Sequence, residues 1–126
     1  MATIADSSVL VSAFNIEDSQ HKKGLQDLSD SSKPILVSEY VAIETTGVLS
    51  LRSSRHIAME FIKVLLERRD LQLIRTSQDF FYLVSAYFVQ AKLQLSFVDC
   101  SLVLLSRDFD ILTFDRTLEK AIKARR

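Results

Sequence analysis

Glycine and proline are scarce in this sequence, whose 126 residues include two glycines and one proline. These two residue types mark many of the turns and breaks in folded chains, so the composition leaves little room for long loops or a flexible linker. Hydrophobic residues make up 48% of the chain, and its length is sufficient for a hydrophobic core. We therefore predict one domain over residues 1–126.

Cysteine and long apolar runs are also scarce. The single cysteine, Cys100, cannot form a disulfide within the chain, which indicates a reducing compartment. No apolar run approaches the roughly 18 residues of a membrane span. The N-terminus lacks the basic segment and apolar stretch of a secretion signal. These features predict a cytoplasmic location without membrane association.

Net charge of either sign is absent, because 16 basic residues balance 16 acidic ones. A net charge of zero provides no general attraction for nucleic acid. If four acids are reserved for a metal site, the other 12 acids face 16 bases and leave a charge of +4. Any binding of nucleic acid then depends on local basic patches and bound cations.

Short apolar segments alternate with segments of helical periodicity along the whole chain. Strands are predicted at residues 2–6, 35–37, 71–74 and 111–114. Helices are predicted at residues 9–14, 19–28, 38–52, 54–69, 77–95, 97–107 and 116–124. This alternation predicts an α/β fold in which helices cover both faces of a parallel sheet.

Two helices invite specific expectations about burial. The polar helix 19–28 is expected to be superficial, with Leu25 and Leu28 as its core contacts. The helix that begins after Ser77 carries apolar and aromatic residues around much of its surface. We therefore expect this second helix to be well buried.

Two of the predicted strands end at an aspartate. Asp6 follows the first strand, and Asp115 follows strand 111–114. Ligands of open α/β sheets bind at the carboxyl ends of the strands, so both acids are expected at one functional edge. Each aspartate also precedes a helix, and an N-cap role is the alternative explanation for both.

Glu44 is the third candidate acid. It shares a stripe of helix 38–52 with Val41 and Val48, and this stripe is expected to face the protein. A carboxylate buried there needs a partner, so a salt bridge to a lysine or arginine is the alternative. Glu39 lies in the first turn of the same helix, where an acid complements the helix dipole, and it is assigned a structural role.

Asp99 is the fourth candidate acid. It follows Ser96 by three residues, which is the spacing of a capping box and gives Asp99 an alternative structural role. Four carboxylates at one edge cannot all remain ionised without cations. Carboxylate oxygens select hard metals such as Mg²⁺ or Mn²⁺. The candidate set is Asp6, Glu44, Asp99 and Asp115.

Other kinds of site lack their residues. His21 and His56 are isolated, which argues against zinc and against a Ser-His-Asp triad, and no glycine-rich phosphate loop is present. A phosphatase of the Asp-x-Asp type is excluded because Ser8 occupies the second acidic position. A phospho-receiver domain needs an acid pair near the first strand and a lysine after a later strand, which do not match this chain.

Four short segments, in order along the chain, carry a resemblance to a known family. They are residues 4–10 (IADSSVL), 41–45 (VAIET), 96–100 (SFVDC) and 111–118 (ILTFDRTL). Together they resemble the PIN-domain ribonucleases, most closely the VapC-type toxins of toxin–antitoxin pairs. The resemblance extends from Ile4 to about Ala121 and implies a single three-layer PIN domain with four to five parallel strands.

The resemblance also implies an activity and a site. PIN nucleases hydrolyse RNA with Mg²⁺ or Mn²⁺, and the family's acidic residues match Asp6, Glu44, Asp99 and Asp115. Ser7 matches the small hydroxyl residue after the first acid, and Ser96 matches the hydroxyl residue before the third. The family further implies a homodimer and a small antitoxin that covers the acidic pocket.

Basic residues supply candidate contacts to the RNA. Arg116, next to Asp115, is a candidate phosphate contact, although an exposed arginine at a helix start is the simpler explanation. An RNA-facing rim is one explanation for five further basic residues, and an ordinary solvated surface is the alternative for each of Arg52, Arg55, Arg107, Lys120 and Lys123. One or two divalent ions would activate water and stabilise charge on the phosphate.

Two other functions fit the same residues. The first alternative to a toxin is a PIN nuclease that acts in RNA processing. The second is a PIN-like module that only binds partners. The four acids argue against the binding module, because such a module need not retain clustered charge that costs stability.

Overall fold

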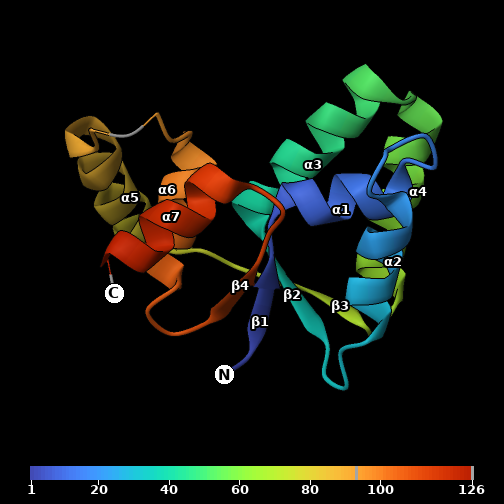
Figure 1. Ribbon diagram of the computed structural model, residues 1–126, viewed down its shortest axis with the longest axis horizontal. Coiled ribbons are helices and arrows are strands. Elements are labelled where there is room, and N and C mark those ends of the chain that lie inside the picture. The colour runs from blue at the N-terminus through green and yellow to red at the C-terminus, as the bar shows by residue number, and fades with distance from the viewer. Residues whose placement is uncertain (93, 126) are drawn as a thin grey trace.

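A four-stranded parallel sheet forms the centre of the molecule, as seen in the computed structural model, which describes residues 1–92 and 94–125 (Figure 1). The strand order is β3-β2-β1-β4. The strands are β1 (Thr3–Ala5), β2 (Ile35–Ser38), β3 (Leu71–Ile74) and β4 (Asp110–Leu112). All neighbouring strands are parallel, so their carboxyl ends lie along one edge.

Two groups of helices flank the sheet. They are α1 (Ser7–Phe14), α2 (His21–Ser29), α3 (Glu39–Arg52), α4 (Arg55–Glu67), α5 (Gln78–Gln90), α6 (Phe97–Leu105) and α7 (Arg116–Arg125). In Figure 1, α1–α4 lie to one side of the strands and α5–α7 to the other. The predicted three-layer α/β fold and the order of its elements are confirmed. None of the helices in the described ranges has the length and apolarity to span a membrane.

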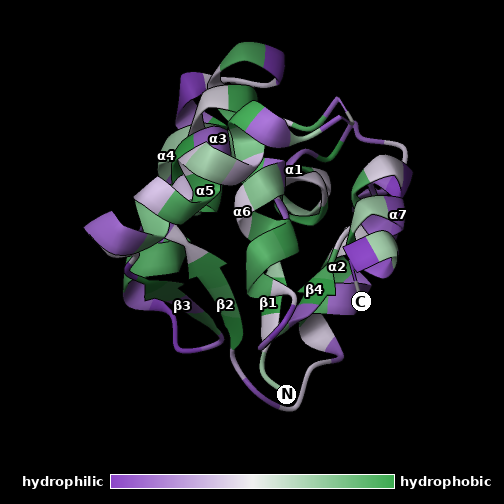
Figure 2. Ribbon diagram, turned by 90° about the vertical axis from the view of Figure 1, so that its left-hand side faces the viewer, coloured by the Kyte–Doolittle hydropathy of each residue, from purple (hydrophilic) through white to green (hydrophobic). Residues whose placement is uncertain are grey.

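The strands are short and strongly apolar because helices cover them. Ile4, Ala5 and Val37 are fully buried, and Ile35 is nearly so. Figure 2 shows these apolar strands at the centre, with polar residues concentrated on the outer helices. The core continues into the helices around Phe61, whose ring meets that of Phe14 edge to face at 5.2 Å.

Serine side chains define where most of the helices begin. The hydroxyl oxygens of Ser38, Ser54, Ser77 and Ser96 each accept a hydrogen bond from the backbone N–H three residues later. These caps satisfy N–H groups that have no partner within the helix. They explain how a chain with two glycines and one proline can change direction so often.

Several sequence expectations about boundaries and burial are wrong. Strand β4 ends at Leu112, because the hydroxyl of Thr113 turns toward Asp6 and the backbone leaves the sheet. The expected helix end at 93–95 is also wrong, since α5 ends at Gln90, and Leu93 itself lies outside the described residues.

Helix α5 is far more exposed than its composition predicts. Its only fully buried residue is Val84, whereas Tyr82, Leu83 and Val89 are 59%, 63% and 81% exposed. The helix packs mainly on α6 and does not lie over the sheet, so most of its apolar surface faces outward. Burial cannot be read from the apolarity of one helix without knowing what covers it.

Helix α2 contacts α1 through a glycine. Leu25, expected in the core, is 45% exposed, and Gly24 is the buried residue of this helix. A Cβ atom added at Gly24 would lie 2.9 Å from the backbone nitrogen of Ala13 and 3.1 Å from the carbonyl oxygen of Val9. The close approach of the two helices therefore requires a residue without a side chain.

We predict opposite effects for alanine at the two glycines. Gly24→Ala forces α2 away from α1 and lowers the free energy of unfolding by about 1–3 kcal/mol. Gly47→Ala in α3 has open space around its Cβ and raises the free energy of unfolding by about 0.5–1 kcal/mol through helix propensity. Urea denaturation followed by circular dichroism measures both, and equal changes for the two variants would contradict this packing.

Candidate active site at the carboxyl edge of the sheet

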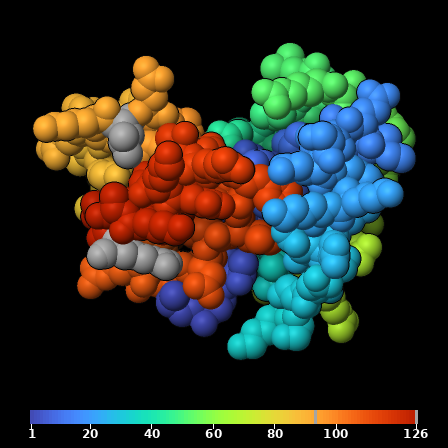
Figure 3. All heavy atoms as spheres, viewed as in Figure 1, coloured from blue at the N-terminus to red at the C-terminus, as the bar shows by residue number. Residues whose placement is uncertain are grey.

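A cavity of about 440 Å³ opens at the carboxyl edge of the sheet. Its walls come from α1, the loop that follows it, α3, the start of α6 and the residues just before α7. Figure 3 shows the surface hollowed between the segment that carries α6 and α7 and the segments that carry α1 and α3. All four candidate acids line this cavity, namely Asp6, Glu44, Asp99 and Asp115.

Asp6 is the most deeply placed of these acids, with 3% of its surface exposed. Its Oδ1 atom accepts a hydrogen bond of 2.7 Å from the N–H of Ser7, so it caps α1 as the alternative explanation proposed. Its Oδ2 atom accepts hydrogen bonds from the hydroxyls of Thr113 and Ser8, at 2.7 and 2.8 Å. Both oxygens are thus oriented by donors from two separate parts of the chain.

The same hydroxyl groups position the start of α7. The N–H of Asp115 donates to Thr113 Oγ1, and the N–H of Phe114 donates to Ser8 Oγ, both at 3.0 Å. Asp115 Oδ1 then accepts hydrogen bonds from the N–H groups of Thr117 and Leu118, at 2.9 and 3.2 Å. Asp115 is therefore a helix cap as well as a wall of the cavity, which confirms the alternative explanation without removing the acid from the site.

Glu44 faces the cavity from α3 and lacks the basic partner that the alternative explanation required. The hydroxyl of Ser7 donates a hydrogen bond to its Oε1 atom. Burial raises the pKa of Glu44, the Ser7 hydrogen bond opposes the rise, and the charges of Asp6, Asp99 and Asp115 add to it. No salt bridge to Glu44 exists among residues 1–92 and 94–125.

Asp99 has both of its expected properties. It forms the predicted capping box with Ser96, in which each side chain accepts a hydrogen bond from the other residue's N–H, at 3.0 and 3.2 Å. Burial raises its pKa, the backbone hydrogen bond from Ser96 lowers it, and the charges of Asp6 and Asp115 raise it further. The negative charges of Asp6 and Asp115 thus disfavour the ionised form of Asp99.

Within residues 1–92 and 94–125, no ion pair involves an acid of the cavity. In the described part of the chain, ion pairs join Lys63 to Glu60 and Arg68 to Asp70, and neither pair lies at the cavity. Within the same residues no group of three acidic, histidine or cysteine side chains is placed closely enough to hold a metal ion. The acids are held near one another by N–H and O–H donors, with their charge left unpaired.

Two of the three supporting residues line the cavity. Ser7 and Ser96 both line the cavity. Arg116 is exposed and is not among the residues that line it. Glu39 has the structural role assigned to it, because its Oε1 atom accepts a 2.7 Å hydrogen bond from the N–H of Thr76 and joins α3 to the segment after β3.

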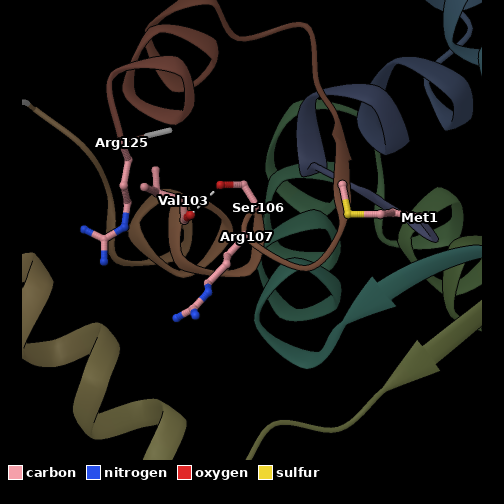
Figure 4. Close-up of a pocket in the computed structure, with 5 residues that line it drawn as sticks. All are labelled: Met1, Val103, Ser106, Arg107 and Arg125. Carbon is pink, nitrogen blue, oxygen red and sulfur yellow. Dashed lines mark hydrogen bonds between the residues drawn. The ribbon is translucent and has the colours of Figure 1, made fainter.

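Four of the basic residues considered for an RNA-facing rim line different cavities of the molecule. Arg52 lines the acidic cavity. Arg107 instead lines a second cavity of about 460 Å³ with Met1 and Arg125, where α6 and α7 end (Figure 4). Arg55 lies in the groove between α3 and α4, and Lys123 lines a further cavity beside β4 and α7. Residues spaced along different helices reach different faces, which charge counting alone cannot show.

Sequence reasoning missed the hydroxyl groups that orient Asp6. The apolar pattern places Thr113 within the strand predicted at 111–114, and the only signal at Ser8 is that it stands in the second acidic position of an Asp-x-Asp motif. Both follow the same edge of the sheet as the two aspartates, since Ser8 lies two residues after Asp6 and Thr113 two residues before Asp115. Their closeness in sequence to the two aspartates is the signal by which both residues can be predicted to belong to the site.

A family model described as the PIN domain matches residues 3–123. The chain belongs to the PIN domain family. No curated protein matches this PIN domain in sequence.

Solved structures agree with this PIN domain fold. One is VapC20 of Mycobacterium tuberculosis, a toxin that cleaves the sarcin-ricin loop, with a TM-score of 0.85 and 18% identity over 95% of each chain. Another is VapBC2 of Rickettsia felis, bound to a DNA fragment from the promoter of its genes. Its TM-score is 0.66, with 16% identity over 96% of this chain and 93% of that chain. These likenesses establish a shared fold.

The raised pKa of Glu44 generates a prediction about stability. Because folding raises this pKa, the stability associated with it is present below the unfolded pKa and is lost as pH rises through the folded pKa. Glu44→Gln keeps an acceptor for Ser7 and removes the charge. We expect it to raise Tm near pH 7.5 in EDTA, with a smaller increase near pH 4, below the ordinary glutamate pKa of about 4.3.

Differential scanning calorimetry at the two pH values measures this difference. Glu17→Gln is the matched control, because Glu17 is exposed in the loop after α1 and does not line the cavity. The control is expected to change Tm little at either pH. An equal increase in Tm for Glu44→Gln at both pH values would show that the charge of Glu44 does not destabilise the folded protein.

Proposed function

We propose that this PIN domain is a divalent-metal-dependent endoribonuclease. The observation that carries the proposal is the gathering of four carboxylates from four parts of the chain around one cavity, without a basic partner among the described residues. Burial, with a smaller contribution from the neighbouring acids, raises the pKa of Glu44 and of Asp99. A clustered charge of this kind favours a cation in the working protein.

The donor atoms fit Mg²⁺ or Mn²⁺. Four carboxylates supply oxygen ligands, and the cavity contains no cysteine or histidine among its lining residues. We propose that Asp6, Glu44, Asp99 and Asp115 hold the ion or ions, directly or through water. A bound ion in such a site supplies an activated water and stabilises charge on the phosphate.

The chain's own groups then have distinct tasks. The donors around Asp6 hold its two oxygens in a fixed orientation, which preorganises the deepest wall of the cavity. Glu44, with its raised pKa and its contact to the Ser7 hydroxyl, is suited to accept a proton from a water that it orients. Ser96 keeps Asp99 at the cavity mouth through the capping box.

The cellular role that we propose is that of a toxin in a type II toxin–antitoxin pair. It is supported by the PIN family membership and by the fold shared with VapC20, which is a sarcin-ricin loop cleaving toxin. The second candidate is RNA processing without a toxin role, which fits the same cavity. A small antitoxin gene next to this one would favour the first.

A small antitoxin is the proposed partner. The fold is shared with VapBC2, which is bound to promoter DNA in its solved structure. The unpaired carboxylates of the cavity offer such a partner a site that basic side chains can cover. A cytoplasmic location and a single functional domain over residues 1–126 belong to the same proposal.

Helix α5 supports the proposed homodimer. Asp79 is its only charged residue, and its exposed apolar residues are Phe81, Tyr82, Leu83, Phe88 and Val89. An exposed apolar face of this kind is typical of an interaction site. A second copy of the chain is the occupant we propose, because it presents the same uncharged surface and allows a closed two-fold contact.

RNA cleavage by the purified protein is the direct test. We expect cleavage of tRNA or rRNA fragments with Mn²⁺ or Mg²⁺, and its loss in EDTA. Asp6→Asn removes the proposed central ligand and is expected to reduce cleavage to background. Asp108→Asn, in the exposed turn after α6, is the matched control and should cleave like the wild type.

The outcomes separate the parts of the proposal. Cleavage that persists in EDTA or in Asp6→Asn would point to a contaminating nuclease or to another site. Absence of both cleavage and Mn²⁺ binding by calorimetry would contradict the metal site and favour the binding module. Binding of Mn²⁺ without cleavage would leave the site in place and reject the chosen RNA substrates.

The homodimer has its own test. Val89→Lys places a charge on the exposed face of α5, where it leaves the monomer's core intact and disfavours a second copy. Sedimentation velocity over a range of concentrations is expected to show a dimer for the wild type and a monomer for this variant. Leu66→Lys, 68% exposed on α4, is the control and should remain dimeric. A wild type that is monomeric throughout would contradict the proposal.

A further inference from the structure

The acidic cavity has one feature that its proposed metal chemistry does not use. Arg52 is the only basic residue among those described as lining the cavity, which is otherwise walled by five acids and several hydroxyl residues. RNA carries negative charge on every phosphate, so the acids of this cavity repel the proposed substrate to the extent that bound cations do not neutralise them. A cation fixed at the wall would reduce that repulsion where the RNA enters.

The position of Arg52 follows from the periodicity of α3. Glu44, Val48 and Arg52 are spaced four residues apart, which places all three on one stripe of the helix, and all three line the cavity. The eight residues from Glu44 to Arg52 correspond to about 12 Å along the helix axis. Arg52 therefore lies at the outer end of the stripe, away from the acids at the sheet edge.

Arg52 is exposed and forms no ion pair within the described residues. In the described residues no carboxylate lies within ion-pair distance of its guanidinium. An arginine in the last turn of a helix also complements the helix dipole, which is the structural explanation for it. The helix dipole explains why an arginine lies in the last turn of α3. It does not explain why Arg52 lies on the same side of the helix as Glu44, facing the cavity.

We propose that Arg52 binds a phosphate of single-stranded RNA at the outer end of the cavity, away from the phosphate that is cut. A guanidinium suits this task, because its planar array of N–H donors matches phosphate oxygens in a bidentate contact. The contact sets the direction in which the RNA crosses the cavity, from the end of α3 toward the acids. This inference rests on the proposed nuclease function and adds to it a substrate-binding residue.

RNA binding tests the inference independently of cleavage. In the Asp6→Asn background, which prevents cutting, the affinity for a labelled single-stranded RNA is measured by fluorescence anisotropy across a series of KCl concentrations. Arg52→Gln is expected to weaken binding about 5- to 20-fold and to reduce the slope of log K against log[KCl] by about 0.7, the loss of one phosphate contact. Arg52→Lys is expected to restore the slope and part of the affinity.

The matched control is Arg69→Gln, which removes the same charge from an exposed residue in the turn between α4 and β3. Its affinity and salt slope are expected to equal those of the parent. In the cleaving protein, Arg52→Gln should raise KM and leave kcat within about twofold, because the contact is made away from the reacting phosphate.

The possible results distinguish this inference from the proposed function. If the wild type cuts RNA, and Arg52→Gln matches Arg69→Gln in affinity and salt slope, the phosphate contact is overturned and the nuclease stands. If Arg52→Gln lowers the Tm as well as the affinity while the salt slope stays constant, the residue acts only through stability. If the wild type neither binds nor cuts RNA, both proposals are overturned.

Discussion

The rest of the site depends on the hydrogen bonds that the buried carboxylate of Asp6 accepts. This carboxylate is buried at the end of β1, and it accepts hydrogen bonds from the start of α1 and from Thr113 beyond β4. These strands are neighbours in the sheet, paired over three residues each. A charge at this depth is tolerable only because donors surround it, and the same donors orient Asp115 through Thr113. Burial, pairing of the strands and placement of two acids are thus one arrangement.

The other two acids show how stability and function oppose one another. Glu44 and Asp99 are held in a partly buried cavity beside like charges, and the pKa of each is raised. The protein supplies hydroxyl and N–H donors there, but among the described residues it supplies no paired cation. A fold under selection for stability alone would replace such residues. Their presence together is the physical basis for proposing a metal-dependent nuclease in this PIN domain.

The periphery of the molecule shows where composition misleads. Helix α5 is among the most apolar segments of the chain, yet Val84 is its only fully buried residue. Helix α2 is mostly polar, yet its glycine makes the tightest contact with α1. In both helices, the distance to the neighbouring element decides which residues are buried, and the sequence of one helix does not specify that distance. The basic residues behave in the same way, since those spread along α4, α6 and α7 reach separate faces.

The sequence by itself determined the order of strands and helices along the chain, the parallel arrangement of the sheet and the choice of four candidate acids. Short apolar strands, serine caps and acids after strands are local signals. Only the tertiary structure decided which of these residues meet. It brought Thr113 onto Asp6 and Phe114 onto Ser8, it turned Arg52 toward the cavity, and it left Arg116 and Arg107 outside. Contacts between residues about a hundred positions apart depend on strand register and on how each helix rotates about its axis. These quantities are set by packing of the whole chain and not by the pattern of any one segment.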